Sequence, residues 1–133
     1  MKRISPATLR DLLEGKHTEV CPQFQVIDCR FAYEFAGGHV RNAQNVDCVE
    51  ALDRMFFGKD AELAGWLDAG AQRPALIFHC EYSEVRAPRL AAHLRKLDRQ
   101  YNMASYPRLT FPDIYILKGG YNQLFGSEPS VCE

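Results

Sequence analysis

Cys80 and Arg86, with five residues between them, are the side chains of this sequence best suited to chemistry on an oxyanion. A loop of that length can curl around a tetrahedral anion such as phosphate or sulfate, with backbone N–H groups pointing inward and the guanidinium as a two-pronged donor. The positive field of such a loop favours the thiolate, which is the nucleophilic form of cysteine. The spacing therefore predicts an anion-binding loop that begins with a nucleophile. The alternative is a buried structural cysteine beside a surface arginine.

The residues on either side of this pair predict the elements that hold it. Residues 75–78 form a short apolar run followed at once by polar residues, which is typical of a buried strand. After Pro88, which suits the first turn of a helix, apolar residues recur at helical spacing at Leu90, Ala91, Leu94 and Leu97. A strand, a loop and a helix in this order place Cys80 at the carboxyl end of the strand and aim the helix N-terminus at the anion.

The predicted loop also supplies the groups that would act around the nucleophile. Its phosphate-binding residues are Glu81, Tyr82, Ser83, Glu84, Val85 and Arg86. Their N–H groups would bind the equatorial oxygens, and Arg86 would stabilise the charge that grows in the transition state. A leaving oxygen needs a proton, and the candidate general acids are Glu81 and Glu84. We expect His79 to point back into the fold and order the loop rather than act as a base.

Strand and helix signals alternate along the rest of the chain. Short apolar segments predict strands at 24–28, 43–46 and 114–117. Helical signals lie between Ser5-Pro6 and Gly15, and at 31–35, 48–57 and 60–67, while residues 100–113 suit no regular element and 121–125 form a last short segment. This alternation predicts an α/β fold, with a parallel sheet flanked by helices on both faces. Ligands of such sheets bind at the carboxyl ends of the strands, where Cys80 falls.

Composition excludes several other classes of protein. The 133 residues suffice for one domain, spanning 1–133, and we expect it to be a monomer. No apolar run approaches the roughly 18–20 residues of a membrane span and no signal-peptide core is present, so we expect a cytoplasmic and/or nuclear protein without a membrane partner. A formal net charge of −1 gives no argument for nucleic-acid binding. The five cysteines include no C-x-x-C pair, so neither a metal site nor a thioredoxin-type motif is predicted.

Basic residues gather on and after the helix that follows the loop. The stretch 86–108 contains one acidic residue, Asp98, and six basic ones: Arg86, Arg89, Arg95, Lys96, Arg99 and Arg108. One interpretation is a solvated helix face. The other is a basic surface around the anion site that attracts acidic or phosphorylated partners.

Three separated motifs resemble one known family. His79-Cys80-Glu81-Tyr82-Ser83 is similar to the HCEFS signature of the M-phase inducer phosphatases, dual-specificity enzymes that activate cyclin-dependent kinases. The stretch from Ile27-Asp28-Cys29-Arg30 through Tyr33-Glu34 to Gly37-Gly38-His39-Val40 resembles that family's IDCRYPYEYEGGHI. The stretch from Tyr106-Pro107 to Gly119-Gly120-Tyr121 resembles its YPSLYYPEMYILKGGY. The motifs keep their order and cover roughly residues 24–132.

The resemblance implies a rhodanese-like catalytic domain that needs no cofactor. Its activity would be removal of phosphate from phosphotyrosine and phosphothreonine of a cyclin-dependent kinase, through a thiophosphate on Cys80. Cys29 would be a redox-resolving thiol, and Arg95, Arg99 and Tyr106 would dock the kinase. The family pattern has a glutamate directly before the arginine, where this chain has Val85, so the identity of the general acid stays open.

Three alternatives share the same loop chemistry. An arsenate or antimonate reductase of the rhodanese-like group would use the same loop length and thiol reductants, because arsenate mimics phosphate in shape and charge. Rhodanese-type sulfurtransferases typically have four residues between the cysteine and the arginine, so five residues argue against that activity. A non-catalytic phosphate-binding module is the third, and the intact Cys80 and Arg86 argue against it.

Overall fold

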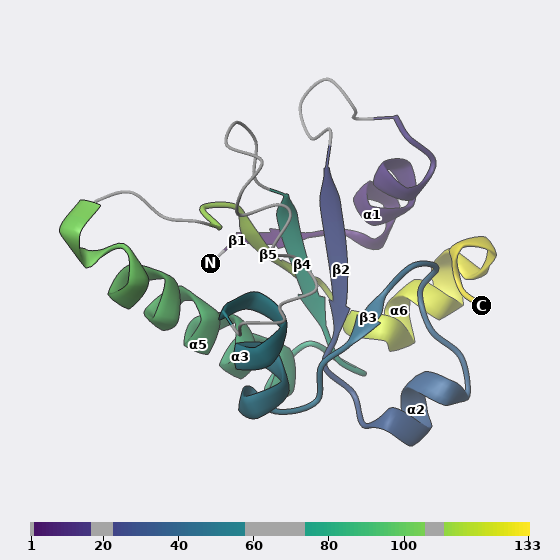
Figure 1. Cartoon of the computed structure of the whole chain (residues 1–133). Coiled ribbons are helices and arrows are strands. Elements are labelled where there is room, and N and C mark those ends of the chain that lie inside the picture. Colours follow the sequence, from purple (N-terminus) through teal and green to yellow (C-terminus); the bar gives the residue numbers. More distant parts are fainter. Residues whose placement is uncertain (1, 17–22, 58–73, 106–110) are drawn as a thin grey trace.

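Five parallel strands form the centre of the computed structural model, which describes residues 2–16, 23–57, 74–105 and 111–133 (Figure 1). They are β1 (Lys2–Ile4), β2 (Phe24–Asp28), β3 (Gln44–Asn45), β4 (Ala75–His79) and β5 (Ile114–Leu117). The strand order β1-β5-β4-β2-β3 puts β4, the strand before Cys80, in the middle of the sheet. The predicted α/β class with a parallel sheet is confirmed.

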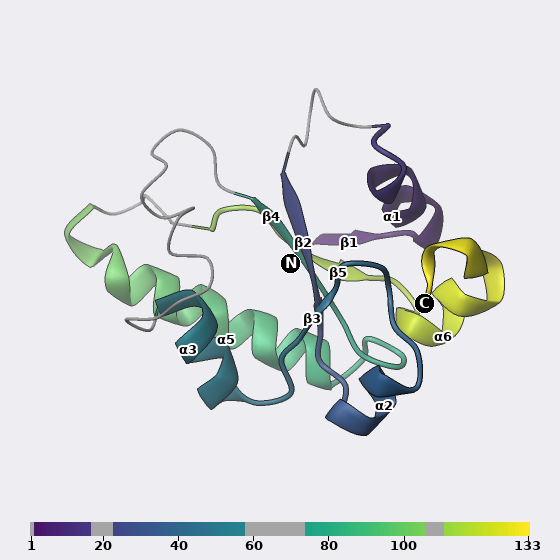
Figure 2. The same cartoon turned by 45° about the vertical axis from the view of Figure 1, so that its right-hand side comes forward.

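Helices cover both faces of this sheet, as predicted (Figure 1, Figure 2). α3 (Val49–Phe57) and α5 (Arg86–Tyr101) lie on one face, and α1 (Pro6–Leu13) and α6 (Gly120–Ser127) lie on the other. The short helix α2 (Ala32–Ala36) follows β2 beyond the carboxyl ends of the strands. Two short 3-10 turns, Met103–Ser105 and Pro129–Val131, follow α5 and α6.

Each face of the sheet has its own buried core, because successive side chains of a strand point to opposite sides. In β4, Leu76 and Phe78 pack with the α3 and α5 side, and Ile77 packs with the α1 and α6 side. All five residues of β4 are buried. A strand covered on both faces is expected to be continuously apolar rather than alternating, which is the pattern that the sequence shows at 75–78.

Most predicted elements occur where the pattern indicated them. The Ser5 hydroxyl accepts a hydrogen bond from the Thr8 amide at 3.1 Å and caps α1, whose first residue is Pro6. The strand predicted at 24–28 is β2, and the helix predicted at 48–57 is α3. The helix expected at 60–67 lies outside the described residues.

Three boundaries were wrong or missed. β1 was not predicted, because it is a three-residue edge strand with two exposed side chains and no apolar run. The start of α5 agrees with the sequence, because the helix begins at Arg86 and has Pro88 in its first turn, as predicted. However, α5 extends to Tyr101 and a 3-10 turn follows at Met103–Ser105, so the first part of 100–113 is regular. The last segment is an eight-residue helix, Gly120–Ser127, and not only 121–125.

Candidate active site

Cys80 and Arg86 lie at the two ends of one tight loop. Cys80 is the first residue after β4 and is buried, and Arg86 is the first residue of α5. Between them lies Ser83, whose side chain is buried. Its backbone adopts the left-handed conformation, with φ of 58°, which marks a sharp turn of the chain. A cavity of about 180 Å³ is lined by Cys80, Tyr82, Glu84, Val85 and Arg86. The predicted strand, loop and helix therefore do bring the thiol and the guanidinium to one cavity.

The carboxylate of Glu34, on α2, holds Arg86 in place. Nη1 of Arg86 donates to Oε1 of Glu34 at 2.8 Å, and the guanidinium carbon of Arg86 lies 5.3 Å from the centre of the Phe31 ring. The hydrogen bond with Glu34 is the largest cause that raises the pKa of Arg86, and the Cys80 sulfur adds to it. The same bond lowers the pKa of Glu34 below its usual value. Both partners are therefore charged at neutral pH.

The two candidate acids of the loop lie in different surroundings. Oε2 of Glu81 is 3.4 Å from Nη1 of Arg30, and Glu81 is not among the residues that line the cavity. Glu84 is exposed and does line it. The geometry thus favours Glu84 over Glu81 as the carboxyl group closer to a bound substrate, and their chemical role stays a prediction.

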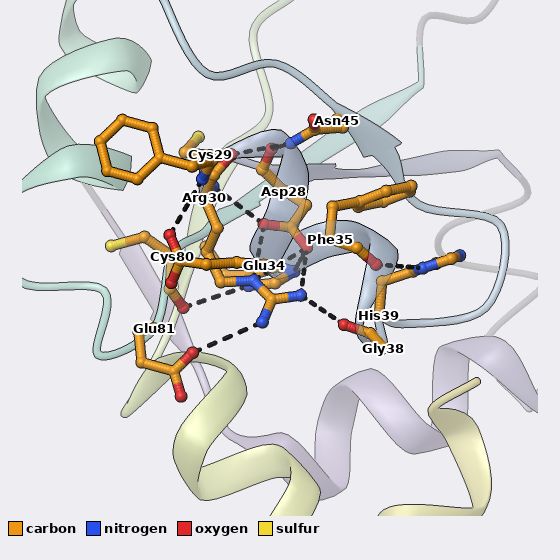
Figure 3. A network of polar contacts seen from close by, with 12 residues as sticks. Asp28, Cys29, Arg30, Glu34, Phe35, Gly38, His39, Asn45, Cys80 and Glu81 are labelled. Carbon is orange, nitrogen blue, oxygen red and sulfur yellow. Dashed lines mark hydrogen bonds and ion pairs between the residues drawn. The ribbon is translucent and has the colours of Figure 1, made fainter.

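A buried arginine ties the loop to β2 (Figure 3). Arg30 is 3% exposed, and its Nε and Nη2 donate to the two carboxylate oxygens of Asp28 at 3.0 and 2.9 Å. Nη2 also donates to the Gly38 carbonyl at 2.7 Å, while Nη1 reaches Glu81. Because paired and hydrogen-bonded charges tolerate burial, Arg30 serves as a fixed link between the end of β2 and the first residue of the loop.

His79 is fully buried behind the loop. Its Nδ1 lies 3.2 Å from the Cys80 carbonyl oxygen, which accepts the hydrogen bond, and its Nε2 is 3.8 Å from Asp28. Burial is the main cause that lowers the pKa of His79, so the ring is neutral at pH 7. A neutral ring that holds the Cys80 backbone fits the structural role predicted for it.

The second thiol lies beside the first. Asp28 and His79 are paired and are the last residues of the neighbouring strands β2 and β4. Cys29 and Cys80 directly follow them in the chain. The Cys29 amide donates to the His79 carbonyl at 2.7 Å, and both cysteines belong to the same buried cluster. Burial, and then the charge of Cys80, raise the pKa of Cys29 well above its usual value.

The first turn of α6 supports the loop from behind. The amides of Tyr121 and Asn122 donate to the carbonyls of Cys80 and Glu81, each at 2.9 Å. Gly120, with φ of 65°, precedes them in close contact with the same carbonyls. From the edge strand β1, Nη1 of Arg3 donates to the Ser83 carbonyl at 3.3 Å. Residues far apart in the sequence thus fix the shape of the loop.

Two of the three predicted docking residues, Arg95 and Arg99, lie on α5 beyond its first turn. Arg99 is exposed, whereas Arg95 is half-buried and its Nη2 donates to the Pro112 carbonyl at 3.1 Å. Arg95 also lines a second cavity of about 180 Å³ with Lys2, Pro112, Asp113, Ile114 and Tyr115. Tyr106 lies outside the described residues.

Sequence reasoning missed the role of Glu34, Arg30 and Gly120. All three stand in the motifs quoted above, but nothing in their spacing relates them to Cys80. Glu34 stood in a predicted helical turn, and its contact with Arg86 depends on the position of β2 next to β4 in the sheet. Among the residues that the structure describes, no three His, Cys, Asp or Glu side chains gather as a metal site, and no helix is long and apolar enough to cross a membrane.

Comparison with known proteins places these features in a family. Residues 5–126 match the model of the rhodanese-like domain. The M-phase inducer phosphatase of Emericella nidulans is 42% identical over 132 residues, which are 99% of this chain and 22% of that protein. The chain therefore spans about a fifth of that relative's length.

Two solved structures share the fold. One is Saccharomyces cerevisiae Ygr203w, a homolog of single-domain rhodanese and Cdc25 phosphatase catalytic domain, with a TM-score of 0.67 and 26% identity over 98% of this chain and 86% of that one. The other is the As-Sb reductase of Leishmania major, with a TM-score of 0.65 and 24% identity over 98% and 80% of the two chains. The second likeness concerns the fold alone.

Proposed function

Because the chain belongs to the rhodanese-like domain family, we propose that it is a cysteine-dependent protein phosphatase of the M-phase inducer type, with dual specificity for phosphotyrosine and phosphothreonine. The observation that carries the proposal is the shared cavity of Cys80 and Arg86 at the two ends of a five-residue loop. The identity of 42% to a phosphatase over nearly the whole chain supports it.

The proposed reaction has two displacement steps at phosphorus. The Cys80 thiolate attacks phosphorus, a P–S bond forms and the P–O bond to the substrate breaks. The leaving oxygen takes a proton, for which Glu84 is the candidate that lines the cavity. Water then attacks phosphorus, the P–S bond breaks, and inorganic phosphate leaves with the thiolate restored. Loop amides and Arg86 stabilise the equatorial oxygens in both steps.

The surroundings of the cavity favour an organic phosphate over a bare inorganic anion. Tyr82 and Val85 line it and are 59% and 61% exposed, while Phe31 and Tyr33 stack on each other with ring centres 5.9 Å apart and are 50% and 76% exposed. An arsenate ion makes no use of such apolar surface, whereas an aryl phosphate or a protein segment does. We propose a phosphorylated protein substrate, and specifically a cyclin-dependent kinase.

Arsenate or antimonate reduction is the second candidate. Cys29 and Cys80 follow the paired residues Asp28 and His79 and belong to one buried cluster, and this favours reduction, because a two-thiol site can release a reduced product as a disulfide forms. The two activities differ in substrate and in co-reactant. A reductase consumes a thiol donor for each arsenate reduced, whereas hydrolysis of a phosphate ester consumes only water.

Turnover of four substrates by one purified protein tests the proposal. They are an aryl phosphate, a doubly phosphorylated kinase-loop peptide, arsenate with a thiol reductant, and thiosulfate with cyanide. We expect turnover of the two phosphate esters, loss of at least about 10³-fold in the C80S variant, and retained binding of phosphate or sulfate by that variant. Arg86→Ala should weaken both turnover and anion binding, because a charge-assisted contact is lost. Arsenate reduction without phosphatase turnover would refute the proposal.

A further inference from the structure

Glu34 is a charged side chain beside the catalytic loop that the proposed reaction does not use. It lies on α2, and its Oε1 accepts hydrogen bonds from the Phe31 amide at 3.0 Å and from Nη1 of Arg86 at 2.8 Å. The first of these bonds belongs to the cap of α2. The carboxylate is therefore fixed by the backbone of its own helix before it contacts Arg86.

The segment 31–34 contacts the Arg86 guanidinium in two ways. Glu34 accepts a hydrogen bond from one guanidinium nitrogen, and the centre of the Phe31 ring lies 5.3 Å from the guanidinium carbon. The Arg86 side chain is 34% exposed and that of Glu34 is 20% exposed, so solvent screens the pair only in part. An arginine side chain has several rotatable bonds, and ordering it on anion binding would otherwise oppose binding.

We propose that Glu34 is a positioning residue that holds Arg86 in the orientation required for oxyanion binding at Cys80. The planar guanidinium has five N–H donors, so one nitrogen can remain on Glu34 while others face the phosphoryl oxygens. This role rests on the proposed phosphatase function for its meaning, but the anion-binding part of it does not require turnover.

Glu34 could instead weaken anion binding, and the two roles predict opposite changes in affinity when Glu34 is removed. A carboxylate beside an anion site repels the ligand and competes with it for the arginine, so its removal would then strengthen binding. Positioning predicts that removal weakens binding. The capping bond adds a structural role, which a substitution has to separate from both.

Two substitutions separate these roles. Glu34→Gln keeps an oxygen acceptor for Phe31 and Arg86 and removes the charge, whereas Glu34→Ala removes both. Glu50→Ala, an exposed glutamate in the first turn of α3, is the matched control. Tungstate is the probe anion, and its binding is measured by titration calorimetry in the C80S background, together with kcat and KM on an aryl phosphate with Cys80 present and with the thermal midpoint of each variant.

We expect E34A to weaken tungstate binding about tenfold and to lower kcat/KM about 10- to 100-fold, mostly through kcat, because misplacement of a group that acts in the transition state affects that constant. E34Q and E50A should stay within about threefold of the parent. Loss of tungstate binding in E34A, with binding retained in E34Q, supports the proposal even if no phosphatase turnover is found.

Three outcomes would overturn it. Tighter tungstate binding by E34A would show competition instead of positioning. Equal losses in E34A and E34Q that follow the thermal midpoint would show a role in folding only. A loss of kcat in E34Q without a loss of tungstate binding would show that the negative charge of Glu34 acts in the chemical step instead of positioning Arg86.

Discussion

Cys29 differs from Cys80 in the surroundings of its sulfur. Both thiols have little exposed surface, 1% for Cys29 and 3% for Cys80, but Cys80 lines the cavity with Arg86, whereas the raised pKa of Cys29 keeps that thiol protonated. A small oxidant can enter the cavity, and a thiol beside a guanidinium is the more reactive one, so peroxide should react with Cys80 first. The two residues follow paired positions of neighbouring strands, so a sulfenic acid on Cys80 has a second thiol beside it.

We therefore predict a reversible disulfide between Cys29 and Cys80. After mild peroxide, the Cys29 thiol displaces water from the Cys80 sulfenic acid, and mass spectrometry should detect the linked peptides until a thiol reductant is added. In the C29S variant peroxide inactivation should become irreversible, with Cys80 found as sulfinic acid. Cys48→Ser is the control, because Cys48 is an exposed free thiol outside the cavity. A link from Cys80 to Cys48 or Cys132 would contradict the prediction.

The sequence predicted the site residues whose relation depends on local spacing. The anion-binding loop from Cys80 to Arg86 was predicted because five residues separate the two side chains between a strand and a helix. Glu34 lies 52 positions from Arg86, and their contact exists only because α2 follows a strand next to β4 in the sheet. Such a partner has no sequence signal without the strand order.

At the scale of elements, α6 and the catalytic loop form one unit. The unpaired amides of the first turn of a helix need acceptors, and here the carbonyls of Cys80 and Glu81 provide them. Gly120 makes this contact possible, because a Cβ there would lie 2.6 Å from the Cys80 oxygen and 2.5 Å from the Glu81 oxygen. Both contacts are with backbone, which has little freedom to move.

Gly120→Ala should therefore damage the site more than the fold as a whole. The positive φ alone costs an alanine about 1–2 kcal/mol, and the backbone overlap adds to it, so we expect the free energy of unfolding to fall by about 2–3 kcal/mol. Activity of the protein that remains folded should fall at least about tenfold, because the overlap displaces the loop that holds Cys80. Denaturant unfolding and kcat/KM on an aryl phosphate measure the two effects.

Gly126→Ala is the control in the same helix. A Cβ at Gly126 meets nothing within 4 Å, so the change should leave activity intact and stabilise the protein by up to about 1 kcal/mol through helix propensity. Full activity of the Gly120→Ala variant would show that the loop does not depend on its contact with α6.

The predicted elements divide according to the strength of their local signal. β4 and β5 are largely buried apolar runs, β2 has the buried apolar pair Val26-Ile27, and the buried residues of α3 lie on one side of the helix, so their patterns identify them. β1 has no such pattern, and its place beside β5 depends on the sheet. The start of α5 was predicted from Pro88, whereas its extension to Tyr101 was missed because the buried positions end at Asp98.

At the scale of the whole molecule, one side of α5 joins the fold and another carries exposed basic residues. Leu90 and Leu94 enter the core, while Arg89, Lys96 and Arg99 are exposed. A cationic surface on the helix that begins at Arg86 suits an acidic or phosphorylated protein partner. Because the chain spans about a fifth of its phosphatase relative from Emericella nidulans, the partner remains a proposal.

A kinase that docks on α5 would contact Arg95 and Arg99. We expect Arg95→Ala or Arg99→Ala to cost at least about 1–2 kcal/mol in kcat/KM toward a phosphorylated cyclin-dependent kinase complex, which is about 5- to 30-fold, with little change toward an aryl phosphate. Arg99→Ala is the sharper test, because Arg95 also donates to the Pro112 carbonyl and its loss can disturb the neighbouring loop. Lys96→Ala, an exposed cation on the same helix, is the control for net charge.

The two substrates separate docking from support of the fold. A docking residue contacts only the protein substrate, so its removal leaves the chemical step on a small ester unchanged. Equal losses on both substrates would mean that the helix supports the cavity instead, and losses in Lys96→Ala as large as in Arg99→Ala would mean unspecific attraction by charge. No loss on either substrate would leave the kinase partner without support and favour reduction of arsenate, whose small substrate requires no surface on α5.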